Sequence, residues 1–159
     1  MSAALALSLC AMPAMAEDVT GETTTTAPLA SAIDKSAKGT ITIHKYEYNG
    51  NDDKNGTGVA GDANNVPTDA KDLEGATFTY YQVMTADELV EYYNGKSTEK
   101  VGINTYVDEK NGQILSAYAN KPNGSGKTGK NGIVKFGDGE TGLPVGLYVI
   151  IETETPAKV

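Results

Sequence analysis

The sequence predicts an all-β fold, a β-sandwich with one short inserted helix. Three observations support this prediction. Apolar and polar residues alternate with a period of two in the clearest segments. Asn-Gly pairs, which favour turns with positive φ, separate many of these segments. Only residues 85–96 carry the start and stop signals of a helix. Six Asn-Gly pairs occur in the sequence, beginning at Asn49, Asn55, Asn94, Asn111, Asn123 and Asn131.

The composition narrows the class of protein. The chain has 159 residues, 13 basic against 21 acidic side chains and a net charge of -8, and it contains no arginine. An acidic chain of this kind is a poor candidate for binding nucleic acid or an anionic membrane surface. No cofactor is implied.

Residues 1–16 are apolar and uncharged, and they end in Ala14-Met15-Ala16. This pattern predicts a secretory signal peptide, with a buried N-terminal helix as the alternative. The basic residues that usually open such a peptide are missing, which leaves open a start upstream of Met1. Cys10 is the only cysteine, so cleavage would leave a mature chain without disulfides or a membrane segment. Residues 17–38 are predicted to be a flexible Thr-rich leader, and residues 39–159 the folded domain.

The first predicted strand, residues 40–48, carries an unexpected charge. With a period of two, Ile41 and Ile43 share a face with Lys45, while His44 points to the opposite face, toward solvent. The face with the two isoleucines should be buried. Lys45 is therefore either a buried amine or a lysine at a strand end whose stem covers apolar surface.

The other elements follow in order. A polar loop runs to residue 72, and residues 76–84 form a strand with Phe78 and Tyr80 on one face. Thr85 caps the helix with Glu88 three residues on, and Asn94-Gly95 ends it. Residues 97–121 are compatible with short strands or a helical piece. A glycine-rich loop at 122–132, a strand at 132–138, a turn at 143–146 and a strand at 147–155 complete the chain.

Two loops have compositions that suggest ligand binding. Residues 124–132, GSGKTGKNG, partly match a phosphate-binding loop, but Lys121 stands where the first glycine is required and no helix is predicted to follow. The loop after the first strand offers oxygen ligands at spacings similar to a calcium loop, at Asn51, Asp53, Asn55 and Asp62. Its first and last residues differ from that motif, so a solvated acidic loop is the favoured interpretation.

Enzymatic groups are scarce. His44 is the only histidine, no cysteine remains after cleavage, and no serine lies in a nucleophile-elbow sequence. The sequence therefore predicts a protein that is not an enzyme.

Three segments resemble the N-terminal domain of Gram-positive pilin backbone subunits, in the SpaA/Cna-B-like group of immunoglobulin-like domains. They are GTITIHKYE (39–47), LEGATFTYYQV (73–83) and GLPVGLYVIIETETP (142–156). The resemblance implies an immunoglobulin-like sandwich in a fimbrial shaft on the cell surface, with neighbouring pilin subunits and a pilin sortase as partners. The alternatives are an adhesin domain that binds host protein or glycan through residues 50–72 or 97–131, and an accessory domain of a secreted hydrolase.

The resemblance also implies a chemical role for the lysine on the first strand. In this group such a lysine condenses with an asparagine side chain into an isopeptide bond, assisted by a buried acid. Burial disfavours the ammonium form, which makes the amine nucleophilic. The matching positions are Lys45 as nucleophile and Glu152 as acid. The asparagine and the lysine motif used by the sortase are expected beyond Val159, so the chain resembles a domain truncated at its C-terminal end.

Overall fold

The structure is a computed structural model that describes residues 32–47, 66, 69–98, 101–137 and 141–156. Its elements in chain order are β1 (Lys38–Gly39), β2 (Ile41–His44), β3 (Tyr46–Glu47), β4 (Lys71–Asp72), β5 (Thr77–Thr85), α1 (Ala86–Tyr93), α2 (Ile103–Tyr106), β6 (Val107–Asp108), β7 (Gln113–Ile114), β8 (Asn123–Lys127), β9 (Ile133–Phe136), β10 (Leu143–Pro144) and β11 (Gly146–Glu154).

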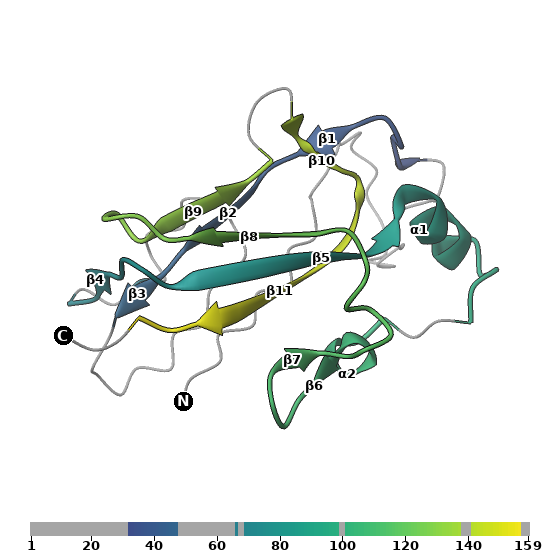
Figure 1. Cartoon of the computed structure of the whole chain (residues 1–159). Coiled ribbons are helices and arrows are strands. Elements are labelled where there is room, and N and C mark those ends of the chain that lie inside the picture. The colour runs from purple at the N-terminus through teal and green to yellow at the C-terminus, as the bar shows by residue number, and fades with distance from the viewer. Residues whose placement is uncertain (1–31, 48–65, 67–68, 99–100, 138–140, 157–159) are drawn as a thin grey trace, which may run out of the picture.

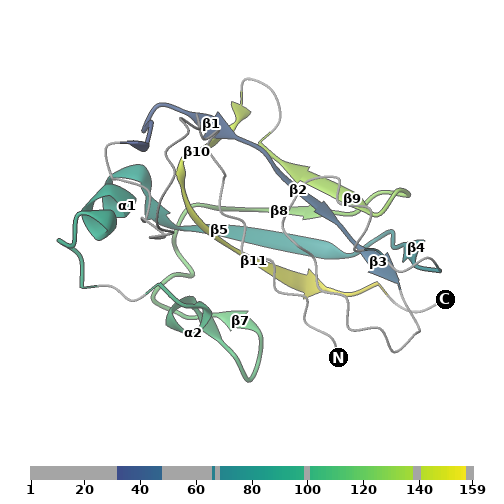
Figure 2. The same cartoon turned by 180° about the vertical axis from the view of Figure 1, so that it is seen from behind.

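The central sheet has the strand order β11–β5–β8, and all its strand pairs are antiparallel. A second ladder pairs β2 with β9, and short ladders pair β1 with β10 and β3 with β4. Figures 1 and 2 place α1 and α2 at one end of the domain and β3 and β4 at the other. The all-β prediction is confirmed, and α2 adds one further helical turn.

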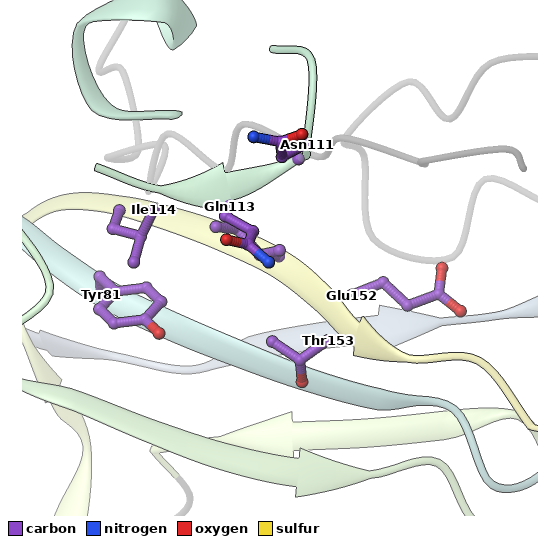
Figure 3. A pocket seen from close by; sticks show the side chains of 8 residues that line it. Tyr81, Asn111, Gln113, Ile114, Glu152 and Thr153 are labelled. Atoms are coloured by element: carbon purple, nitrogen blue, oxygen red, sulfur yellow. The ribbon is translucent and has the colours of Figure 1, made fainter. Parts of the chain in front are cut away.

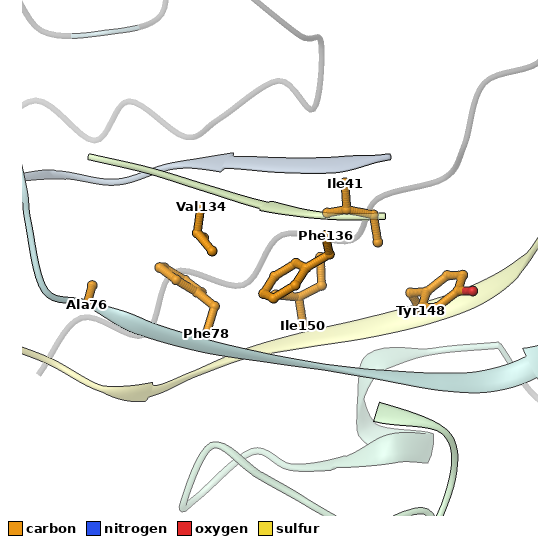
Figure 4. Packing of buried hydrophobic residues seen from close by; sticks show 7 residues of the cluster. All are labelled: Ile41, Ala76, Phe78, Val134, Phe136, Tyr148 and Ile150. Carbon is orange, nitrogen blue, oxygen red and sulfur yellow. The ribbon is translucent and has the colours of Figure 1, made fainter. Parts of the chain in front are cut away.

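The core of the sandwich lies between the β2–β9 ladder and the central sheet (Figure 4). We call its buried residues the inner cluster: Ile41, Ala76, Phe78, Val134, Phe136, Tyr148 and Ile150. Tyr80 packs edge-on against Phe136, with ring centroids 4.9 Å apart. Ile41, Phe78 and Tyr80 thus take the faces that their period-two pattern predicts.

The opposite face of the central sheet is covered by the segment between β5 and β8. We call the buried residues there the outer cluster: Val83, Met84, Tyr106, Val107, Leu147, Val149 and Ile151. Helix α1 opens this segment with the predicted capping box, because Thr85 accepts from the Glu88 N–H and the Glu88 carboxylate accepts from the Thr85 N–H. The ambiguous region 97–121 contains α2 and the β6–β7 pair.

Residues 122–132, predicted to be a loop, contain strand β8, so that prediction is wrong. Two of its glycines lie beneath side chains: a Cβ on Gly124 would lie 2.8 Å from the Tyr80 ring, and one on Gly126 would lie 2.7 Å from Val134. These glycines allow close packing on a strand, which a sequence pattern does not separate from a turn. Likewise Asn123-Gly124 is a strand segment, whereas Gly95, Gly112 and Gly132 have positive φ in turns as predicted.

Two smaller predictions also change. The first strand is interrupted at Lys45, where the chain leaves β9 and pairs with β4. Leu143 and Pro144, predicted to be part of a turn, pair with β1. Within the described residues, no helix is long and apolar enough to cross a membrane.

Candidate functional site

Lys45 and Glu152 meet at the β3 end of the sandwich. The Lys45 Nζ donates to Glu152 Oε2 over 2.8 Å, although the two residues are 107 positions apart in the sequence. Their side chains are 16% and 6% exposed, respectively. The pair is therefore largely removed from water. A buried ion pair needs further hydrogen bonds to offset the desolvation of its charges.

Glu152 lacks one of those hydrogen bonds. Its Oε1 atom is buried and has no hydrogen-bond partner among the described residues. Because side chains alternate along β11, Glu152 shares the inner face with Tyr148 and Ile150, as its parity predicts. The site thus presents one paired carboxylate oxygen and one that remains available as an acceptor.

The backbone of Lys45 is held from two sides. Its N–H donates to Gly132 O over 2.8 Å, and its carbonyl accepts from the Leu73 N–H over 2.9 Å. One bond comes from the turn before β9 and the other from the residue after β4. Lys45 is therefore fixed at the point where the strand changes its pairing partner.

The residues flanking Lys45 form a separate network on the other face. One His44 ring nitrogen, Nε2, lies 2.8 Å from Asp72 Oδ1, and the other, Nδ1, lies 2.6 Å from the Tyr46 hydroxyl. Both ring nitrogens of His44 are thus engaged, and its tautomer decides which partner donates in each contact. Burial raises the pKa of Tyr46, and the negative charge of Asp72 raises it further. This network joins the end of β2 to β3 and β4 through His44, and these contacts do not include the Lys45 amine.

A pocket of about 400 Å³ lies beside β11 (Figure 3). Its lining residues are Tyr81, Asn111, Gly112, Gln113, Ile114, Ile151, Glu152 and Thr153. In Figure 3 the Glu152 carboxylate points away from Tyr81 and Gln113. The carboxylate that pairs with Lys45 is therefore not directed at the part of the pocket that Tyr81 and Gln113 line.

The other predicted sites do not add to this one. The calcium candidates Asn51, Asp53, Asn55 and Asp62 lie outside the described residues. Within the part of the chain that is described, no group of three or more His, Cys, Asp or Glu side chains is placed to hold a metal ion. In the rejected phosphate-loop segment, Thr128 is a buried hydrogen-bonding residue, 2% exposed.

Sequence reasoning missed the residues that hold Lys45 in place. Gly132 and Leu73 bond directly to the Lys45 backbone, and the Thr128 hydroxyl donates to Leu73 O. The Asn131-Gly132 pair was a signal for a turn, but nothing in a single sequence shows which strand that turn contacts.

Comparison with known proteins gives a family. Residues 36–159 match the family model described as Gram-positive pilin subunit D1, N-terminal domain. The chain is also similar to the "Fimbrial subunit type 1" of Actinomyces viscosus, with 34% identity over 143 residues, which cover 88% of this chain and 24% of that protein. No solved structure matches the chain significantly.

The match explains the features described above as parts of one domain. It includes the strand with Lys45, the insertion over the outer face and the strand with Glu152. Both descriptions are of subunits of pili or fimbriae. The chain belongs to the family of N-terminal D1 domains of Gram-positive pilin subunits.

Proposed function

We propose that this chain is the exported N-terminal domain of a fimbrial shaft subunit, and that it docks head-to-tail with neighbouring subunits in the fibre. The family match over residues 36–159 carries this proposal. The chain spans about a quarter of the fimbrial subunit that it matches, so the activity of the whole protein is part of the proposal. Residues 1–16 serve as its signal peptide, residues 17–38 as a leader, and a pilin sortase joins the subunits.

Immunogold electron microscopy of the bacterium tests this role. Antibodies against residues 32–156 should label fibres on the wild-type surface, and deletion of the gene should remove the fibres. Fibres that persist after deletion, with adhesion to host cells lost, would support an adhesin in place of a shaft subunit.

The proposal includes a self-catalysed crosslink at Lys45. The Lys45 Nζ attacks the side-chain carbonyl carbon of an asparagine beyond Val159, so that a C–N bond forms and the bond to the amide NH₂ breaks. One proton moves from the amine to the departing group, which leaves as ammonia. Glu152, as a carboxylic acid, donates its proton to the departing group and takes up the proton that the attacking amine releases, so the acid is unchanged at the end.

Two observations support the crosslink. The 2.8 Å contact between Lys45 Nζ and Glu152 Oε2 allows direct proton transfer, which yields a neutral amine and a carboxylic acid. The second carboxyl oxygen, Oε1, is buried and has no partner within the described residues, so it offers an acceptor for the hydrogen atoms of an incoming amide.

Intact-mass measurement of the full-length subunit tests the bond. Each bond should lower the mass by about 17 Da, one ammonia. Lys45→Ala and Glu152→Gln should each abolish one such loss. Lys135→Ala removes an exposed lysine from β9 and should leave the mass deficit unchanged. A full deficit in Lys45→Ala would exclude Lys45 as the nucleophile.

A further inference from the structure

The turn from Thr128 to Gly132, which joins β8 to β9, contacts the backbone of Lys45 by two routes. On one route Gly132 O accepts the Lys45 N–H over 2.8 Å. On the other route the Thr128 hydroxyl donates to Leu73 O over 2.7 Å, and the Leu73 N–H donates to Lys45 O over 2.9 Å. A single turn therefore acts on both peptide groups of Lys45.

Thr128 is held by its own buried contacts. Its hydroxyl oxygen accepts the Ala76 N–H over 3.0 Å while it donates to Leu73 O. Its backbone N–H donates to Ala76 O, and its carbonyl accepts from the Gly75 N–H, both over 2.9 Å. An isosteric valine would leave the buried Ala76 N–H and the part-buried Leu73 carbonyl without these partners.

Gly132 approaches Lys45 more closely than any residue with a side chain could. Its φ is +67°, and a Cβ there would lie 2.4 Å from Lys45 O and 3.2 Å from Leu73 N. A Cβ only 2.4 Å from Lys45 O would require the backbone of Lys45 or of the turn to shift. The turn is also braced internally, because the Gly132 N–H donates to Gly129 O over 2.9 Å.

We infer that the Thr128–Gly132 turn positions the amine of Lys45 against Glu152, with Gly132 and Thr128 as the positioning residues. The expected effect on the rate of bond formation rests on the proposed crosslink. The positioning of the amine rests only on the Lys45–Glu152 contact. Neither residue touches the reacting atoms. A displacement of about 1 Å in a reacting group can slow a reaction by about 100-fold, so a small shift of the Lys45 backbone is enough to matter.

The test compares two glycine variants of the full-length subunit. Gly132→Ala introduces the close contact, and Gly95→Ala is the matched control, because Gly95 has a similar φ of +68° and nothing lies within 4 Å of its Cβ position. The time course of ammonia loss after synthesis is followed by intact mass. We expect formation about tenfold slower in Gly132→Ala and unchanged in Gly95→Ala. Equal rates in Gly132→Ala and wild type would overturn the inference.

The two threonine variants give a second test that survives if Gly132→Ala does not fold. Thr128→Val should slow ammonia loss, and Thr128→Ser, which keeps the hydroxyl, should restore most of the rate. Val107→Ala, in the outer cluster, controls for lower stability. It should keep the wild-type rate of ammonia loss even where its melting temperature is as low as that of Thr128→Val. Slowing by Val107→Ala equal to that by Thr128→Val would reduce the turn to a structural role and overturn the inference.

Failure of the proposed crosslink can be distinguished from failure of the positioning inference. If Lys45→Ala keeps the full mass deficit, the proposed bond is wrong and Lys45 remains a free amine. Its acetylation by limiting reagent, measured against Lys135 by peptide mass spectrometry, then tests the positioning. Several-fold faster acetylation in Gly132→Ala than in Gly95→Ala supports the inference, and equal acetylation overturns it.

Discussion

The two faces of the central sheet are both buried, but they are covered in different ways. The inner cluster lies between the central sheet and a second strand ladder, β2–β9, whereas the outer cluster lies under two short helices and a two-residue ladder. Strand β11 serves both, with Tyr148 and Ile150 on the inner side and Val149 and Ile151 on the outer side. An uninterrupted apolar run such as LYVII therefore marks a strand buried on both faces.

Both clusters consist of apolar and aromatic side chains, but a buried ion pair, Lys45–Glu152, lies beside the inner one. Regular strand packing on the inner side brings distant residues to defined positions. We expect packing on the inner side to determine whether the domain folds. Packing on the outer side should determine whether residues 86–121 stay packed on the central sheet.

The largest effect should come from truncating the inner cluster. Phe78→Ala removes a ring that is 4% exposed, and it should lower the free energy of unfolding by about 3–5 kcal/mol. Urea denaturation followed by circular dichroism measures this. The loss should be global, with weaker hydrogen-exchange protection in β2, β5, β9 and β11 together.

Tyr106→Ala is the matching change in the outer cluster, where the ring is 1% exposed. Its loss should act mainly on the segment between β5 and β8, because Tyr106 is the most buried side chain that this segment contributes to the outer cluster. Hydrogen exchange should speed up within residues 101–121 and change little in β2 and β9. Equal loss of protection in all strands would show that the two faces fold as one unit.

A smaller effect is expected at the ion pair. Lys45→Met keeps an apolar stem but leaves the Glu152 carboxylate buried without its cation, and it should cost about 3 kcal/mol at neutral pH. Adding Glu152→Gln should recover part of this loss. The exposed change Lys135→Met should stay within about 0.5 kcal/mol. A double variant no more stable than Lys45→Met would contradict the explanation.

The smallest effect concerns the start of α1. Thr85→Ala removes the cap and should cost about 1 kcal/mol. The hydrogen bond from the Thr85 N–H lowers the pKa of Glu88 below its ordinary value of 4.5, with Lys121 adding to this and burial opposing it. The carboxylate therefore stabilises the fold above that value, and this contribution is lost as the pH falls through the lower folded-state pKa.

Unfolding measured from neutral pH down to about pH 3 checks the sign of this effect. The gap in stability between wild type and Glu88→Gln should narrow as the pH falls. A gap that widens on acidification would show that Glu88 does not act as a charged cap.

Sequence periodicity identified the strands of the inner face and the capped helix, because those depend on local alternation and on short-range hydrogen bonds. It also assigned Lys45 and Glu152 to core-facing positions, and the structure brings their side chains into contact. Their chemical role stays a prediction. The pattern failed where a glycine contacts a residue from another strand or loop: Gly126 lies beneath Val134, and Gly132 lies against Lys45. Such contacts depend on the tertiary fold.

The position of the insertion has a consequence for solubility. Strands β5 and β8 are antiparallel neighbours with Tyr81 opposite Asn123, so the segment between them is topologically an enlarged hairpin loop. A short turn could replace it without changing the strand order. The apolar outer side of β5 and β11, which includes Val83, Val149 and Ile151, would then face water as one contiguous patch. A shortened variant should therefore aggregate unless these positions are made polar, which makes the insertion a cover that keeps this sheet soluble.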